Sequence, residues 1–183
     1  LEVKLIRDEN KKLKEIDFDR NKLIGSSSNT TKVRDIINKV ANTSSRILIT
    51  GESGTGKDLV AREIHNKSMF KDGPFIVVNA SLLEPDGIEN ELFGIEENGI
   101  IKHTGLFEKA NNGSLFIDEV GEMPLQTQIK ILRVLTEQSF TRMGGEKIVN
   151  IETRIIASST KDLILAIKEN QFRQDLYHRL NVV

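Results

Sequence analysis

Short apolar runs alternate with amphipathic segments along most of this chain. The runs are typical of buried strands, and they lie at residues 46–50, 74–79, 114–118 and 153–158, with a fifth expected to begin at 181–183. Between them, apolar residues recur every three or four positions, which predicts helices; examples are Val33, Ile36, Ile37 and Val40, and later Leu125, Ile129, Leu132 and Leu135. Strands that alternate with helices predict an α/β fold with a mostly parallel, five-stranded sheet between layers of helices.

The segment after residue 120 holds three more local signals. Pro124 fits the first position of a helix, where the missing N–H has no partner to lose. Gly144-Gly145 joins two short extended runs and predicts a tight hairpin. Two short helices are expected near residues 163–169 and 174–180.

The first 20 residues form a densely charged segment that differs from the rest of the chain. Val3, Ile6, Asn10 and Leu13 alternate at spacings of three and four, which is a short coiled-coil seam with an asparagine that can fix register. A single solvated helix explains the same pattern equally well. We expect residues 1–20 to be a helical linker, able to form a dimer, and residues 21–183 to form the α/β domain.

Bulk composition narrows the functional classes. The 183 residues carry 26 basic and 27 acidic side chains, so the chain lacks the basic excess of a nucleic-acid-binding module. The absence of cysteine excludes disulfides and thiolate metal sites. The three histidines lie far apart in sequence and are not expected to ligate metal. No apolar run is long enough for a membrane span and no signal peptide is visible, so a cytoplasmic location is expected.

The glycine-rich stretch after the first strand carries the clearest chemistry. It reads Gly51, Glu52, Ser53, Gly54, Thr55, Gly56 and Lys57, and a helical pattern follows at once. Glycines let backbone N–H groups turn toward phosphate oxygens, and the helix N-terminus adds partial positive charge. Lys57 would reach the β- and γ-phosphates of a nucleotide such as ATP. Asp58 stands where the usual motif has a serine or threonine that helps to hold Mg²⁺, so either the loop binds another ligand or magnesium is contacted differently.

A second motif supplies acidic groups. The strand at 114–118 ends in Asp118 and is followed by Glu119. In a protein with a phosphate-binding loop, Asp118 would hold Mg²⁺, mainly through water, and Glu119 would polarise the attacking water. The carboxyl ends of parallel strands meet at one edge of a sheet, so both motifs and the turn Ser159-Thr160 should lie together. That turn could sense the γ-phosphate, or it could simply cap the next helix.

Taken in order, these motifs resemble the central AAA+ ATPase domain of bacterial enhancer-binding proteins, the NtrC family of sigma-54-dependent regulators. The resemblance covers about residues 23–183, and the family normally has an acidic residue after the loop lysine, as at Asp58. It places Leu23, Ile24 and Gly25 on the adenine side of the nucleotide. Further matched segments are 91–94, 113–119, 131–135, 142–145 and 172–181.

The resemblance also implies roles for three polar residues. Arg173 and Arg179 stand where the family has arginine fingers, which reach a neighbouring subunit's nucleotide and stabilise charge on the transferred phosphoryl group. Asn79 aligns with a residue that restrains the catalytic glutamate until assembly is correct. Activity is therefore expected to depend on a ring of subunits.

One departure from the family pattern bears on function. Members that open promoters have a Gly-Ala-Phe-Thr-Gly-Ala loop after Glu-Leu-Phe-Gly, and this tip touches sigma-54. Here Gly94 is followed by a shorter, charged and aliphatic segment at 95–104, and the loop motif is absent. The pattern most resembles the NtrX branch, which is paired with the sensor kinase NtrY. By that resemblance, a receiver domain and a helix-turn-helix that contacts promoter DNA lie elsewhere in the parent protein, and the helical lid is absent from this chain.

Three hypotheses about function therefore remain. The first is an ATP-binding regulatory domain of the NtrX type, in which hydrolysis needs arginines from a neighbour. The second is a true sigma-54 activator with an unusual loop. The third is a nucleotide-gated oligomerisation module that scarcely turns ATP over. An unrelated P-loop or AAA+ ATPase would leave the number of matched segments unexplained.

Overall fold

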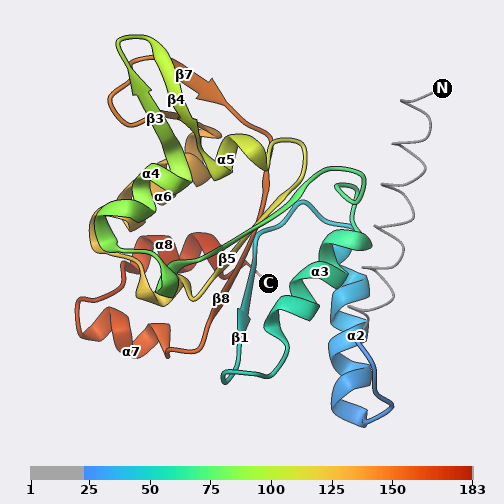
Figure 1. Cartoon of the computed structure of the whole chain (residues 1–183). Helices are drawn as coiled ribbons and strands as arrows, with labels where there is room; N and C mark the ends of the chain where they lie inside the picture. Colours follow the sequence, from blue (N-terminus) through green and yellow to red (C-terminus); the bar gives the residue numbers. More distant parts are fainter. Residues whose placement is uncertain (1–22, 183) are drawn as a thin grey trace, which may run out of the picture.

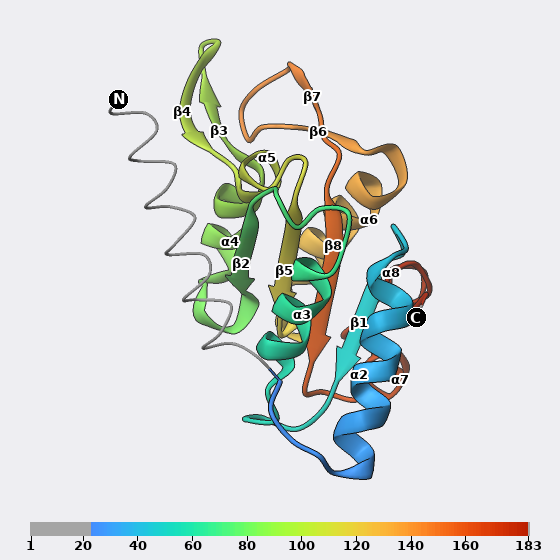
Figure 2. The ribbon, with the colours of Figure 1, turned by 90° about the vertical axis from the view of Figure 1, so that its right-hand side faces the viewer.

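The computed structural model describes residues 23–182, and its centre is a parallel sheet of four strands. Strands β1 (Ile47–Thr50), β2 (Phe75–Asn79), β5 (Ser114–Asp118) and β8 (Arg154–Ser159) lie in the order β1-β8-β5-β2, and every neighbouring pair is parallel. Their carboxyl ends therefore point toward one edge of the sheet, the lower edge in Figure 2. These are the four complete strands that the apolar runs predict. The predicted linker at residues 1–20 lies outside the described residues.

The prediction of a fifth strand is wrong for the part of its segment that the structure describes. Asn181 and Val182 form a turn at the end of helix α8 (Gln174–Leu180). The N–H of Asn181 donates to the Tyr177 carbonyl at 2.8 Å, and the N–H of Val182 donates to the Leu180 carbonyl at 3.0 Å. Backbone donors that are bonded to their own helix cannot pair with the edge of a sheet.

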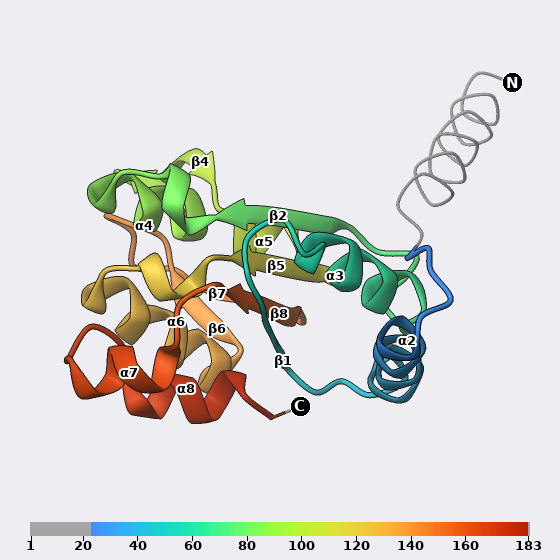
Figure 3. The ribbon, with the colours of Figure 1, turned by 90° about the horizontal axis from the view of Figure 1, so that it is seen from below.

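Helices cover both faces of the sheet. The helices are α2 (Ser28–Ala41), α3 (Lys57–Asn66), α4 (Pro85–Phe93), α5 (Leu106–Lys109), α6 (Leu125–Glu137), α7 (Leu163–Lys168) and α8, with short 3₁₀ turns η1 (Ala80–Leu82) and η2 (Val120–Glu122). Figure 3 shows α2 and α3 on one side of the strands and α6, α7 and α8 on the other. Pro124 precedes α6 with an extended ψ of 146°, so the helix begins one residue later than predicted.

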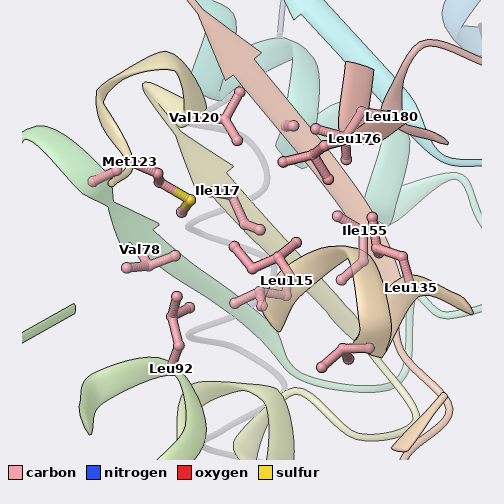
Figure 4. Close-up of a cluster of buried hydrophobic side chains, with 14 of the residues drawn as sticks. Val78, Leu92, Leu115, Ile117, Val120, Met123, Leu135, Ile155, Leu176 and Leu180 are labelled. Carbon is pink, nitrogen blue, oxygen red and sulfur yellow. The ribbon is translucent and has the colours of Figure 1, made fainter. Parts of the chain in front are cut away.

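The two faces have separate apolar cores because side chains alternate along each strand. Phe116 and Ile156 pack with residues of α2 and α3. Their neighbours Leu115, Ile117 and Ile155 point to the opposite face, where they join a larger cluster with α4, α6 and α8. Figure 4 shows this larger cluster, in which side chains from the sheet and from the helices converge.

Two antiparallel hairpins lie at the end of the sheet opposite to the strand carboxyl ends, at the top of Figure 1. The first joins β3 (Gly94–Glu97) to β4 (Ile100–Thr104) through Asn98 and Gly99, whose φ angles are 52° and 77°. Two successive positive φ angles in Asn-Gly are typical of a type I′ turn. The segment at 95–104, expected as a loop, is thus a paired hairpin.

The second hairpin pairs β6 (Ser139–Thr141) with β7 (Ile148–Asn150). Its connection runs from Arg142 to Lys147 and is longer than the tight Gly144-Gly145 turn that was predicted. The extra length follows from a competing partner, because Met143 donates its N–H to the Gly94 carbonyl and accepts from the N–H of Glu96, both at 2.9 Å. The loop therefore bonds to the first hairpin.

In the part of the chain from 23 to 182, no helix combines the length and the apolar character that a bilayer span requires.

Candidate functional site

The polar residues singled out in the sequence gather where the four strands end. Thr50 of β1 lies opposite Ser159 of β8, and Asn79 of β2 lies opposite Asp118 of β5. The strand order places β8 between β1 and β5. As a result the loop after β1, the acidic pair after β5 and the turn after β8 form one rim, as expected for the carboxyl edge of a parallel sheet.

The glycine loop, residues 51–56, wraps around the ammonium group of Lys57. Lys57 Nζ donates to the carbonyls of Gly51 and Glu52, both at 3.1 Å, and the side chain is only 8% exposed. Gly54 and Gly56 have φ angles of +77° and +85°, which favour glycine. Lys57 is also the first residue of α3, so the loop ends at a helix N-terminus, where anions are favoured.

Asp118 is fixed by two neighbouring strands. Its Oδ1 accepts a hydrogen bond from the Ser158 hydroxyl, and its Oδ2 accepts from Asn79 Nδ2 at 3.0 Å. The carboxylate therefore keeps one orientation at the strand end, with further lone pairs on both oxygens. Asn79 contacts Asp118 rather than Glu119, and its own Oδ1 accepts the N–H of Ser81 at 2.9 Å.

Glu119 links the acidic pair to the glycine loop. Its Oε1 lies 3.7 Å from Lys57 Nζ, and its Oε2 accepts both the N–H and the hydroxyl of Thr160 at 2.9 and 2.8 Å. Burial raises the pKa of Glu119, but the bonds from Thr160 and the charge of Lys57 lower it by more, so its pKa lies below the ordinary value. The group is therefore an anion at neutral pH.

The remaining predicted residues lie at varied distances from this centre. Leu23 is half-buried against the core that α2 and α3 share, whereas Ile24 is exposed. The carbonyls of Leu23 and Gly25 accept from Arg34 at 3.2 and 2.9 Å. The Ser159 carbonyl accepts the N–H of Gly51 at 3.4 Å, which ties the turn to the loop. The loop side chains of Glu52, Ser53 and Thr55 and the adjacent Asp58 are exposed.

The two predicted finger arginines lie away from this loop, on α8 and beside it. Arg173 precedes α8 and forms an exposed ion pair with Asp175 at 2.7 Å. Arg179 lies in the last turn of α8. Burial lowers the pKa of the Arg46 guanidinium, and the positive charge of the nearby Arg179 lowers it further. In residues 23–182, neither arginine has a hydrogen bond or ion pair with the glycine loop of its own chain.

Sequence reasoning missed one residue of the rim, Ser158. Its hydroxyl donates to Asp118 and accepts the N–H of Glu119 at 3.2 Å, so it orders both members of the acidic pair. The signal was its place at the end of the third rim strand, one residue before the turn that was noted. The residues that Ser158 contacts depend on the order of the strands in the sheet, and the sequence does not specify that order.

A second charged cluster, Arg142 with Glu96 and Glu108, lies at the opposite end of the sheet. Arg142 is 6% exposed, and it donates to Glu96 at 2.9 Å and to both oxygens of Glu108 at 2.9–3.1 Å. The hydrogen bonds to Glu108 raise the pKa of Arg142 by more than burial lowers it. The cluster joins the first hairpin, α5 and the loop of the second hairpin.

Within the described range, no three acidic or histidine side chains come close enough to form a ready metal site. The three histidines lie on three different elements: His65 on α3, where it bonds Ser114 at 2.9 Å, His103 on β4 and His178 on α8. A divalent ion at Asp118 would thus take most of its oxygen ligands from water and from a bound ligand.

Comparisons with known proteins agree with this geometry. The family model of the Sigma-54 interaction domain matches residues 23–183. The nitrogen assimilation regulatory protein NtrX of Azorhizobium caulinodans is 45% identical over the whole chain, which spans 40% of that protein. Crystal structures of NtrX from Brucella abortus in complex with ADP and with ATP are 46% identical, with TM-scores of 0.89 and 0.86; they cover 100% and 98% of this chain, and 41% and 43% of their own.

A more distant structure bears on the fold alone. The P-loop NTPase domain of a sigma-54 transport activator from Escherichia coli has a TM-score of 0.59 at 18% identity, covering 86% of this chain and 92% of that one. The matched region, residues 23–183, contains the four-stranded sheet, the loop that wraps Lys57 and the acidic strand end. This chain belongs to the family of sigma-54 interaction domains, and its fold is the α/β core of a P-loop AAA+ protein.

Proposed function

We propose that residues 21–183 are the AAA+ ATPase domain of a two-component transcription regulator resembling NtrX. This domain would bind ATP with Mg²⁺ and, when assembled into an oligomer, hydrolyse the ATP. One observation carries the proposal: Lys57 Nζ lies 3.7 Å from Glu119 Oε1, so the glycine loop and the acidic strand end lie side by side at one edge of the sheet. The nucleotides bound by the Brucella relative support the same ligand class.

Each rim residue has a role that its contacts support. The backbone of residues 51–58 and the Lys57 ammonium would hold the phosphates, and, by the resemblance alone, residues 23–25 would border the adenine. Asp118 offers hard oxygen donors in a fixed orientation, so it would hold Mg²⁺, largely through water, and the ion would supply positive charge beside the phosphates. Glu119, an anion beside this position, would polarise the attacking water.

Nucleotide affinity tests the first part of the proposal. Replacing Lys57 with alanine removes the cation that faces the phosphates, and ATP affinity should fall by roughly 30-fold, the effect of about 2 kcal/mol for a buried charge pair. Titration calorimetry of the 183-residue chain measures it. Lys102→Ala, an exposed change on β4, is the matched control and should bind like the original chain. Equal ATP affinity for Lys57→Ala would contradict the proposed site.

We further propose that Arg173 and Arg179 act on a neighbouring subunit. Arg173 precedes α8 and Arg179 lies within it, and α8 covers the sheet face opposite to α3, the helix that Lys57 begins. Full-length Lys57→Ala and Arg179→Ala variants should each be inactive alone and should recover part of the ATPase rate when mixed, because each supplies what the other lacks. The rate per subunit should also fall on dilution. If the mixture recovers no ATPase activity, or if the rate per subunit stays constant on dilution to monomers, the arginines do not act on a neighbouring subunit.

The partners follow from the family and from the hairpin. By resemblance, a receiver domain would take the signal of an NtrY-like sensor kinase, and a helix-turn-helix would bind promoter DNA, both outside this chain. By the resemblance, the hairpin at 94–104 would correspond to the sigma-54-contacting loop, but its sequence lacks Gly-Ala-Phe-Thr-Gly-Ala, and Arg142 bonds Glu96 of its first strand. We therefore infer that sigma-54 is not its target.

A genuine sigma-54 activator is the second candidate, and one observation favours it. Ile100 and Ile101 on β4 are 61% and 48% exposed, so the hairpin carries an apolar surface that could contact a partner. Mixing the full-length protein with sigma-54 and an ADP–metal-fluoride mimic of the transition state discriminates the two. We expect no stable complex; a complex that Ile100→Ser and Ile101→Ser abolish would establish the activator.

A further inference from the structure

Gln128 of α6 is a buried amide that the proposed chemistry does not use. Its side chain is 0% exposed, and burying an amide is unfavourable unless hydrogen bonds compensate for the lost water. Its Nε2 donates to the Met123 carbonyl at 2.8 Å and to the Gln171 carbonyl at 3.0 Å. Its Oε1 accepts the N–H of Arg173 at 2.8 Å. All three partners are main-chain groups.

These bonds leave the amide of Gln128 no proton to offer a ligand. A glutamine side chain has two N–H donors and one carbonyl, and both donors are used here. The amide also has a single satisfied orientation, because the reverse one would set its carbonyl against two main-chain carbonyls. Gln128 therefore holds other segments in place and does not itself contact a nucleotide.

The partners of Gln128 lie on two segments that are distant in sequence. Met123 is the residue that follows η2, the turn that begins directly after Glu119 at the rim. Gln171 and Arg173 lie in the connection between α7 and α8, and Arg173 is the residue before α8 begins. Gln128 reaches this connection across 43 and 45 residues. It therefore ties the start of α8 to the segment that follows the acidic strand end of the same chain.

Arg173 is held more firmly at its main chain than at the tip of its side chain. Its N–H is bonded to the buried amide of Gln128, whereas its guanidinium is 39% exposed and pairs with the exposed Asp175 at 2.7 Å. Exposed ion pairs are weak. The tip of the side chain can therefore leave Asp175 for another anion while its starting point stays fixed.

We propose that Gln128 is a positioning residue, which fixes the main chain at Arg173 so that this arginine reaches a neighbouring subunit's nucleotide from a set starting point. This inference rests on the proposed action of Arg173 and Arg179 on a neighbour. Misplacing a group that acts on the reaction by about 1 Å costs up to roughly 100-fold in rate. Loss of the Gln128 amide should therefore impair the subunit that supplies the arginines and spare the subunit that binds the ATP.

Mixtures of full-length variants separate these two roles. Lys57→Ala subunits supply the arginines but bind ATP poorly, and Arg179→Ala subunits bind ATP but lack one arginine. Gln128→Met keeps the length of the side chain and removes its hydrogen bonds. Combined with Lys57→Ala, it should lower the ATPase rate recovered on mixing with Arg179→Ala by about 10- to 100-fold. Combined with Arg179→Ala and mixed with Lys57→Ala, it should leave the recovered rate within about twofold.

Two further variants control for a general loss of stability. Thr127→Val removes a hydroxyl that is also buried on α6 but bonds Glu89 at 3.4 Å, and in the Lys57→Ala background it should leave the recovered rate within about twofold. Gln128→Glu keeps the size and the acceptor for Arg173 but loses both donated bonds. It should behave like Gln128→Met, so the test stands even if one of the two variants misfolds. Equal losses in both roles, or no loss in the arginine-supplying role, would overturn the proposal.

Hydrogen exchange at the Arg173 amide reads the positioning without turnover. In the 183-residue chain, this N–H should exchange about fivefold or more faster in Gln128→Met than in the original chain, because its acceptor is gone. Thr127→Val should leave the exchange rate unchanged. An equal rate in Gln128→Met contradicts the inference even if ATP is hydrolysed. If Lys57→Ala and Arg179→Ala recover no activity on mixing, the proposed action on a neighbour fails instead, and the exchange rate still decides whether Gln128 fixes Arg173.

Discussion

Two clusters, one with a buried lysine beside a carboxylate and one with a buried arginine between two carboxylates, lie at opposite ends of the sheet and differ in how many bonds hold the cation. At the rim, the ammonium of Lys57 has two carbonyl partners at 3.1 Å and one carboxylate at 3.7 Å. At the hairpin end, the guanidinium of Arg142 makes four hydrogen bonds of 2.9–3.1 Å to two carboxylates. A planar fork saturates carboxylates in a fixed geometry, whereas an ammonium is a point charge that can exchange partners.

The difference indicates that the two ends of the sheet have different roles, ligand binding at the rim and structural stability at the hairpin end. The loose cluster lies at the proposed nucleotide site, where a triphosphate would replace existing partners of the cation, so weak contacts there would favour binding. The closed cluster joins elements that are distant in sequence, β3, α5 and the loop after β6, so strong contacts there favour a fixed hairpin. We expect carboxylates at the rim to matter for turnover and those at the hairpin end to matter for stability.

The largest expected effect is on turnover at the rim. Glu119→Gln keeps the size of the side chain but removes its basicity, so the ATPase rate of the full-length protein should fall by roughly 10²- to 10⁴-fold with ATP binding retained. Glu96→Gln, at the hairpin end, is the matched control and should keep the rate within about threefold while lowering stability, since a hydrogen bond to a charged group is worth about 1.5–3 kcal/mol. Equal losses of ATPase rate in Glu119→Gln and Glu96→Gln would contradict the expected difference between the two clusters. Regulation that survives Glu119→Gln would favour the nucleotide-gated oligomerisation module.

The largest effect on stability is expected from Arg142. Its replacement by alanine leaves Glu96, itself 7% exposed, as a buried charge without its partner, and breaking such a pair costs about 3–5 kcal/mol of unfolding free energy. Urea unfolding of the 183-residue chain measures it. Arg142→Lys keeps the positive charge but loses the planar fork, so its free energy of unfolding should lie between those of the original chain and Arg142→Ala. A loss below about 1 kcal/mol would mean that the cluster is not closed.

The same truncation at the rim should cost much less stability. Lys57→Ala removes a cation whose carboxylate partner lies 3.7 Å away, and the two loop carbonyls are free to bond water instead. A drop of no more than about 1 kcal/mol in the free energy of unfolding is expected without nucleotide, in the range of weak ion pairs. Urea unfolding beside Arg142→Ala gives the direct comparison. Comparable losses for both variants would show that the rim is as tightly closed as the hairpin end.

The smallest expected effect is a pH dependence that Glu119 adds. Burial raises its pKa, but the Thr160 bonds and the Lys57 charge lower it further, to below the ordinary value of 4.5. The unfolded chain therefore takes up this proton first as the pH falls. The group contributes stability above about pH 4.5, and the contribution is lost as the pH falls through the folded pKa. The stability difference between the original chain and Glu119→Gln should hold above about pH 4.5 and shrink as the pH falls below it in urea titrations; parallel curves would contradict this.

Local patterns in the sequence predicted most of the framework. The four complete strands, the layers of helices, the glycine loop with Lys57 and the acidic pair at 118–119 each depend on residues that are neighbours along the chain. Where the prediction was wrong, a competing backbone partner decided the outcome, a distant one after β6 and a local one at 181–182. The turn after β6 lengthens because Met143 bonds to β3, and the segment 181–182 turns because its N–H groups bond back to α8. The Asn98-Gly99 pair would have revealed the first hairpin, because Asn-Gly favours the type I′ turn.

What the sequence determined by itself was which groups would reach the rim, because strand ends and loops are local features. Only the tertiary structure decided which group touches which. Thr160 bonds Glu119 across 41 residues, Ser158 bonds Asp118 across 40, and Arg142 reaches Glu96 across 46. The first two pairings follow from the order β1-β8-β5-β2, in which the last strand in sequence lies between two earlier ones, and the third follows from the packing of the two hairpins. A short-range pattern carries no record of that order, since it is set by the packing of whole elements.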